Sequence, residues 1–239
     1  MKKIYLLISA VILISQTSCA QKSIKGNGNV VQDSRQTESY DKITLIGSAK
    51  VELIKGTEGK LTVSAESNIL PYVETVVKGN ELIVKFKDNF SYSSKKGVKI
   101  TVPIQEISDL KLKGSGDIIG TNLLNLDDLN LHVNGSGDIS LNVNCQSVKA
   151  EVNGSGDILL KGKANELKGM VNGSGDLKSK ELTVLKSELK VNGSGDIDST
   201  TTNEVDAYVF GSGDIRIYGN PTNVTQKVQG SGDISISKK

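Results

Sequence analysis

The chain has 239 residues, with 29 Lys and Arg against 27 Asp and Glu, six Tyr, three Phe and no Trp. Once Lys2 and Lys3 are set aside as part of an export signal, basic and acidic residues balance at 27 each. Without a basic excess the chain cannot release counterions from phosphates, which excludes nucleic acid as a partner. About 220 residues beyond the signal are enough for one domain with its own core.

Residues 1–18 have the features of a lipoprotein signal peptide. After Lys2 and Lys3, an apolar run covers positions 4–14. This run is about half as long as the ~20 residues of a membrane-spanning helix, so it indicates export. The following QTSCAQ places Cys19 directly after small residues, which resembles a bacterial lipobox and predicts lipidation of Cys19. Ordinary cleavage after Ala20 is the alternative interpretation of the same residues.

The sequence between the signal and the repeats falls into two parts of different composition. Residues 19–38 are polar and are predicted to form a tether, whereas residues 39–108 are predicted to hold irregular N-terminal strands. Strand-like alternation occurs at 39–56, 60–66, 72–79, 80–86 and 98–103, with Gly79-Asn80 as a hairpin signal. Residues 88–97 are predicted to be a polar loop.

The motif GSGD is repeated throughout residues 109–239. Its seven copies begin at Gly114, Gly135, Gly154, Gly173, Gly193, Gly211 and Gly230. A fixed period of about 19 residues marks a stack of similar units, none of which can bury its apolar face alone. Apolar residues alternate with polar ones on both sides of each motif, as Leu129 and Leu131 do before the second copy and Ile139 and Leu141 do after it. Period-two alternation indicates strands, and one repeat is long enough for one turn of a flattened coil.

We therefore predict an all-β fold, a single-stranded β-helix-like solenoid that occupies residues 39–239, with regular coils at 109–239. The glycines are expected where a Cβ would not fit.

The alternation places the Ser and Asp of each motif on the outer face, in a ladder that runs along the stack. The candidate ligand-facing residues are Ser136, Asp138, Ser155, Asp157, Ser174, Asp176, Ser194, Asp196, Ser212 and Asp214. Like charges at strand spacing repel each other, so the column needs an explanation. The carboxylates either accept hydrogen bonds from backbone or Ser donors, or they face a bridging cation or ligand.

No metal and no cofactor are predicted. Calcium-binding β-rolls place Asp two residues after the second glycine, whereas GSGD places it immediately after, and calcium requires six to eight oxygen ligands. No catalytic residues are predicted either, because seven nearly identical carboxylates do not provide the two different environments that acid and base roles require. His132, the sole histidine, is expected to point outward, and Cys145 shares the inward phase of the core.

The order of segments SYDKITLIGSAKVELIKG, VSAESNILPYVETVVKGNELIVKF, VKITVP and then GSGDI repeats, following a Cys-bearing export signal, resembles the bacterial family called "head GIN domain, putative auto-transporter adhesin". The resemblance covers the chain from about Thr37 to the C-terminus. It implies a β-helical fold in envelope proteins of Bacteroidetes-type bacteria, and it supplies no catalytic residues.

These observations predict a non-catalytic envelope lipoprotein that is anchored to the outer membrane through Cys19 and acts as an adhesin or binding scaffold. Its partners would be the membrane and an envelope or extracellular protein or glycan. Two alternatives stay open: a periplasmic structural scaffold without a diffusible ligand, and a glycan-binding module. The side of the outer membrane that the domain faces also stays open.

Overall fold

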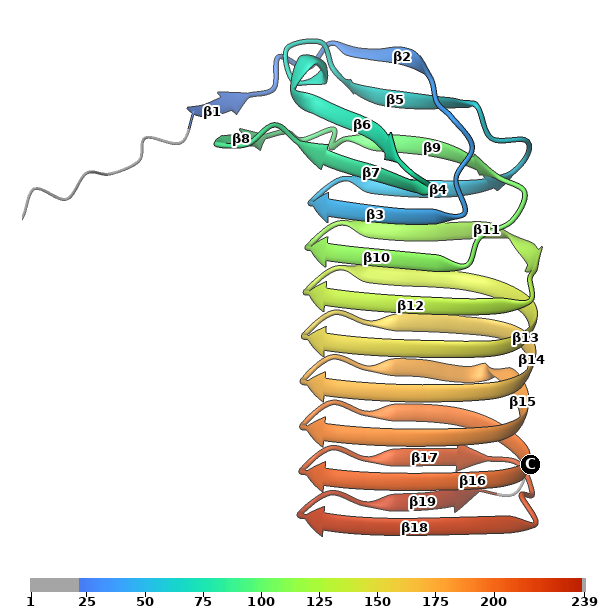
Figure 1. Cartoon of the computed structure of the whole chain (residues 1–239). Coiled ribbons are helices and arrows are strands. Elements are labelled where there is room, and N and C mark those ends of the chain that lie inside the picture. The colour runs from blue at the N-terminus through green and yellow to red at the C-terminus, as the bar shows by residue number, and fades with distance from the viewer. Residues whose placement is uncertain (1–21, 238–239) are drawn as a thin grey trace, which may run out of the picture.

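The computed structural model describes residues 22–237, so the predicted signal peptide and Cys19 lie outside the described residues. Within them the chain forms nineteen β-strands and one 3-10 turn, η1 (Leu70–Tyr72). No helix in this part of the chain has the length and apolar character needed to cross a membrane. Most strands stack in one column of coils (Figure 1). The predicted β-solenoid is confirmed.

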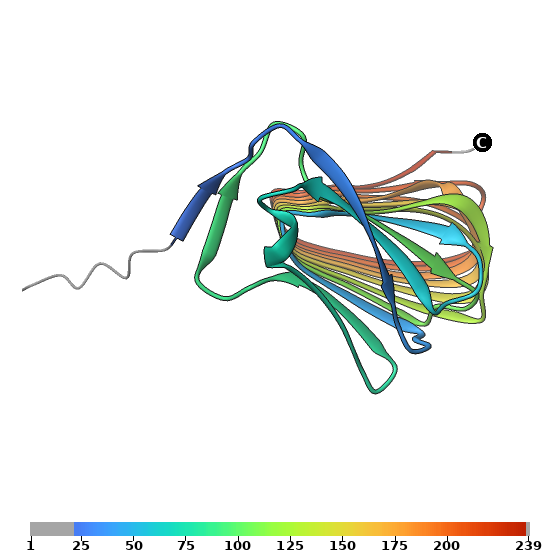
Figure 2. The ribbon, with the colours of Figure 1, turned by 90° about the horizontal axis from the view of Figure 1, so that it is seen from above.

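Each regular coil consists of two strands joined by a sharp turn at the GSGD motif, which we call the glycine corner. The strands that lead into the motif form a parallel front sheet, and the strands that follow it form a parallel back sheet (Figures 1 and 2). The front sheet contains β3 (Lys42–Gly47), β10 (Asp109–Gly114), β12 (Asp128–Gly135), β18 (Asn223–Gly230) and the second halves of β13 (Asp138–Gly154), β14 (Ile158–Gly173), β15 (Leu177–Gly193) and β16 (Ile197–Gly211). The back sheet contains β4 (Lys50–Lys55), β11 (Asp117–Asn125), β17 (Ile215–Tyr218), β19 (Ile234–Ser237) and the first halves of β13 to β16.

Equivalent positions of successive repeats lie side by side along the stack. Asn134 pairs with Asn153 and Gly135 with Gly154, and the same register continues into β14 and β15. Each repeat position therefore forms a column of side chains, spaced by roughly 4.8 Å, the distance between hydrogen-bonded strands.

The core lies between the two sheets and consists of the inward residues of every coil. Leu131 and Val133 from the front sheet and Ile139 and Val143 from the back sheet are all fully buried. Complete burial of one such side chain contributes about 1.5–3 kcal/mol. One coil shields only part of this surface, so the stack as a whole provides the core.

The glycine corner requires glycine because neighbouring coils touch there through their backbones. A Cβ on Gly156 would lie 2.1 Å from the carbonyl oxygen of Gly137, and a Cβ on Gly154 would lie 2.3 Å from that of Gly135. Gly154 also has a φ of +134°, which other residues rarely adopt. The backbone N–H groups of Ser155 and Gly156 both donate to the Gly135 carbonyl, at 2.9 and 3.0 Å. The expectation that no Cβ fits here is confirmed, and the obstacle is the preceding coil.

The first coil consists of β3 and β4, and its corner is the degenerate motif GSAK. Gly47 pairs with Gly114, and Lys50 stands where the next coil has Asp117. Beyond this coil, β7 (Glu81–Phe86) and β9 (Lys99–Ile104) continue the stack in parallel on β3 and β4. The strands β5 (Lys60–Glu66) and β6 (Val73–Lys78) then pair antiparallel to β9 and β7 and close the head of the solenoid.

Two segments differ from their predicted character. The segment predicted as a polar tether contains β1 (Lys22–Lys25) and β2 (Val30–Gln36), and the predicted loop at 88–97 contains β8 (Phe90–Ser93). β2 pairs antiparallel with β5, and β1 pairs in parallel with β8. The order of these strands comes from pairing with distant segments, and in β8 also from ring contacts of Phe90 and Tyr92.

Candidate functional site: the acidic ladder and the charged groove

The structure brings the predicted ladder residues together in one column beside the glycine corner. The Oδ1 atom of each ladder Asp accepts a 2.9 Å hydrogen bond from the backbone N–H of the Asp in the next coil. This bond joins Asp138 to Asp157, Asp157 to Asp176, Asp176 to Asp196, Asp196 to Asp214 and Asp214 to Asp233. The donor is thus neither a Ser hydroxyl nor a turn amide of the same coil. The ladder serines Ser136, Ser155, Ser174, Ser194 and Ser212 are exposed.

Two cations from the back sheet offset the repulsion within the column. Lys178 forms ion pairs with Asp157 and Asp176, and its hydrogen bond to Asp157 raises the pKa of its ammonium group. Arg216 reaches Asp196 at 2.9 Å and Asp214 at 3.1 Å. The hydrogen bonds between coils and the ion pairs with Lys178 and Arg216 together stabilise the closely spaced carboxylates from Asp157 to Asp214. Among residues 22–237, no group of three or more His, Cys, Asp or Glu side chains is placed to hold a metal ion.

A parallel amide ladder stands one position before the motif. The Nδ2 atoms of Asn153, Asn172 and Asn192 donate to Oδ1 of the preceding Asn at 3.1, 2.8 and 2.7 Å. These hydrogen bonds join the Asn side chains of the four NGSGD repeats into a second column beside the carboxylates.

Asp198, which lies near this column, has a buried carboxylate oxygen, Oδ1, without a hydrogen-bond partner among the described residues. The nearest cation, Arg216, lies 3.8 Å away. Desolvation raises the pKa of Asp198, and the charges of Arg216 and Lys180 only partly oppose this effect.

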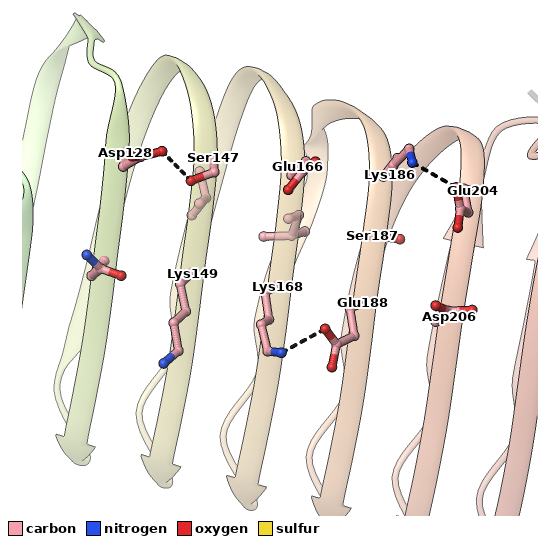
Figure 3. A pocket seen from close by; sticks show the side chains of 13 residues that line it. Asp128, Ser147, Lys149, Glu166, Lys168, Lys186, Ser187, Glu188, Glu204 and Asp206 are labelled. Atoms are coloured by element: carbon pink, nitrogen blue, oxygen red, sulfur yellow. Dashed lines mark hydrogen bonds and ion pairs between the residues drawn. The ribbon is translucent and has the colours of Figure 1, made fainter.

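The front sheet carries a charged groove of about 540 Å³ that sequence reasoning missed. Figure 3 shows two adjacent columns of side chains that line it. The first column is Asp128, Ser147, Glu166, Lys186 and Glu204, and the second is Asn130, Lys149, Lys168, Glu188 and Asp206. Five carboxylates and three ammonium groups make the groove net acidic. The sequence feature that could have predicted this groove is the recurrence of charged residues at the same two outward positions of successive repeats.

Some charges of the groove are paired and others are not. Lys168 contacts Glu188 at 2.7 Å, and Lys186 contacts Glu204 at 3.1 Å. Lys149, Glu166 and Asp206 form no ion pair or hydrogen bond with the described part of the chain. Glu166 still stands beside Lys186 and interacts with its charge, so Lys149 and Asp206 are the charges of the groove that are most available to a binding partner.

The remaining reactive side chains have structural surroundings. His132 lies on the outer face with Nδ1 at 3.5 Å from Glu151 Oε2. Cys145 is a buried free thiol, as predicted, and burial, with a smaller contribution from Asp128, raises its pKa to about 11. A thiol with this pKa is almost entirely protonated at neutral pH and is a poor nucleophile.

Comparisons with known proteins agree with this architecture. The model of the family described as "Putative auto-transporter adhesin, head GIN domain" matches residues 39–221. A crystal structure of a "putative adhesin" from Bacteroides fragilis has a TM-score of 0.85 and 24% identity, with 89% of this chain and 99% of that chain covered.

A "putative lipid binding protein" from Parabacteroides distasonis has a TM-score of 0.74 and 28% identity, over 91% of this chain and 100% of that one. A "putative adhesin" from the same species has a TM-score of 0.73 and 22% identity, over 90% and 100% of the two chains. No curated protein matches the sequence.

Proposed function

The chain belongs to the head GIN domain family, and from this premise we propose that it is a non-catalytic cell-envelope lipoprotein whose solenoid binds an envelope or extracellular partner, with adhesion as its principal role. The Cys19 lipid would attach it to the outer membrane. Relatives described as adhesins support this proposal.

The charged groove is the observation that carries the binding role. The groove gathers charged side chains of several coils in one hollow of about 540 Å³, where a single partner can contact more than one of them. Lys149, Glu166 and Asp206 line this hollow and form no hydrogen bond or close ion pair with the described residues. A protein segment with complementary charges, or a glycan that offers hydroxyl groups to the carboxylates, fits such a surface.

The Ser and Asp ladder remains a second candidate surface, for a glycan. Its serines are exposed, and the outer oxygen of Asp138 has no cation beside it in the described residues. The ladder is nevertheless the weaker candidate, because one oxygen of each carboxylate already serves the coil stack.

Protease shaving of intact cells tests the adhesive role, with a periplasmic protein as the lysis control. Removal of the domain from intact cells is expected for an adhesin. Survival of the domain until the outer membrane is opened would contradict adhesion and favour the periplasmic scaffold. Metabolic labelling with a fatty acid tests the anchor separately, since Cys19→Ser must abolish it.

Adhesion of cells to immobilised extracellular proteins and glycans tests the groove. Lys149→Glu is expected to reduce attachment, whereas Lys163→Glu on the back sheet should leave it unchanged, because both lysines are exposed and both changes alter the net charge equally. Equal effects of the two variants would exclude the groove as the binding surface.

A further inference from the structure

A two-stranded arm projects from the head of the solenoid. It consists of β1 and β8, which form a small parallel sheet of their own and pair with none of the described strands of the solenoid or its head. Figures 1 and 2 both show this arm extending sideways from the column of coils. Ile24 of β1 lies beside Tyr92 of β8, and the N–H of Gly26 donates to the Ser93 carbonyl at 2.9 Å. Tyr92 holds the base of the arm, because its ring packs against the hydrophobic core and its hydroxyl lies 3.3 Å from that of Ser48.

An aromatic cluster joins the arm to the head. The rings of Tyr72 and Phe90 stack with centroids 4.1 Å apart, and those of Phe86 and Tyr92 are 4.6 Å apart. These four rings are nearly half of the nine aromatic residues of the chain, and all four are only partly buried. Beside them lies a hollow of about 450 Å³, which extends to Ser48 at the first corner.

The same region is strongly basic. Residues 22–29 and 85–97 together contain six lysines and one acidic residue, Asp88, whereas residues 109–239 contain 14 basic and 17 acidic residues. Lys25, Lys87, Lys95 and Lys96 are exposed. Only Lys85 is neutralised by described carboxylates, at 3.3 Å from Asp88 and 3.5 Å from Glu74. The positive charge is thus concentrated on the arm and its base.

The position of the arm along the chain decides which partner suits it. Only two residues separate Cys19 from Lys22, the first residue of β1. Three residue steps span at most about 10 Å, so an acyl group on Cys19 would hold the arm against the bilayer. Lysines beside Tyr and Phe are the side chains that suit the headgroup region of an anionic membrane.

We propose that the β1–β8 arm and its base form a membrane-contact surface that binds anionic lipid headgroups through exposed lysines such as Lys25, Lys95 and Lys96, with Phe90 at the interface. This inference rests on the proposed lipid anchor for its orientation. The charge and the aromatic cluster support it independently of the lipid. The arm would orient the solenoid so that its coils, with their acidic excess, point away from the bilayer.

Vesicle co-sedimentation tests the proposal with residues 20–239, which contain the whole described fold and lack Cys19. Vesicles of phosphatidylglycerol and phosphatidylethanolamine are compared with vesicles of phosphatidylcholine alone, at low and high salt. Binding is expected only to the anionic vesicles and only at low salt. Absence of binding to anionic vesicles at low salt would overturn the proposal. It would leave the proposed lipidation of Cys19 untested, because the protein used lacks that residue.

Matched charge variants locate the contact. Lys95→Glu with Lys96→Glu is expected to lower vesicle binding by at least roughly 25-fold, since each surface lysine contributes about fivefold. Lys163→Glu with Lys227→Glu changes the net charge equally on exposed positions of the coils and should have much less effect. Equal losses would show that net charge rather than the arm governs binding, which would overturn the proposal.

A fluorescent reporter gives a second readout. The chain has no Trp, so Phe90→Trp introduces a single tryptophan, which can be excited selectively at wavelengths where tyrosine does not absorb. Its emission is expected to shift to shorter wavelength with anionic vesicles and to stay unchanged with phosphatidylcholine. Sedimentation with anionic vesicles without any shift would place the contact elsewhere and overturn the assignment.

Discussion

The backbone N–H of Asp157 donates a 2.9 Å hydrogen bond to Oδ1 of Asp138, nineteen residues earlier in the chain. The same bond recurs down to Asp233. It continues the parallel hydrogen-bond ladder across a corner where the backbone turns. The repeated geometry of the column is therefore a property of the coil stack, and a bound ion is not needed to explain it.

Replacing one ladder carboxylate should weaken the stack. Asp138→Ala removes the acceptor for the Asp157 N–H and is expected to lower the free energy of unfolding by about 1 kcal/mol, as urea denaturation would show. Asp138→Asn keeps an acceptor oxygen and should lose less. Asp233→Ala is the matched control, because no described coil follows Asp233. A loss for Asp233→Ala as large as that for Asp138→Ala would contradict the structural role of this bond.

A methyl group at the glycine corner should be far more damaging. Gly156→Ala places a Cβ 2.1 Å from the Gly137 carbonyl oxygen, so two coils must separate. The expected loss is about 3 kcal/mol or more in the free energy of unfolding. Ser155→Ala, at the exposed position between the two glycines, should stay within about 0.5 kcal/mol of wild type. Normal stability of Gly156→Ala would mean that the coils do not approach so closely.

The raised pKa of Asp198 makes stability depend on pH. Between the ordinary Asp value near 4 and the raised folded value, the folded state binds more protons than the unfolded state. The free energy of unfolding contributed by this group therefore falls as pH rises through that window. Asp198→Asn should remove this loss and be more stable than wild type at pH 7. Urea titrations from pH 4 to 7 would test this, and parallel curves for the two proteins would contradict it.

The Cys145 thiol should resist modification in the folded protein. Its pKa of about 11 and its burial leave little accessible thiolate at pH 8. Ellman's reagent is expected to titrate Cys145 only after denaturation in guanidinium chloride. Cys145→Ser gives the background from Cys19. Rapid reaction of Cys145 without denaturant would show that the core at β13 opens readily.

The regular coils could be predicted from the sequence because their information is local. Leu129, Leu131 and Ile139 keep one alternating phase through the glycines, so strands, inward faces and the period follow from one repeat. The outward position of the ladder and the burial of Cys145 follow from the same phase.

The hydrogen-bond partner of each ladder carboxylate, the paired strands of the head and the groove could not be predicted in this way. The N–H that binds Asp138 belongs to a residue nineteen positions away, and Lys22 of β1 meets Phe90 of β8. β14 and β15 shift register between Leu159 and Lys161, so that Glu166 stands beside Lys186, twenty positions on.

The sequence by itself determined the strand period, the inward face and the position of each corner, because these follow from alternation and repetition within one coil. The reason that each corner needs glycine lies in the preceding coil, whose backbone leaves no space for a Cβ. Only the tertiary structure decided which charges share a column and which polar strands find an edge to pair with. Those contacts join residues far apart in the chain, and their register depends on how many residues each coil uses to return to the corner.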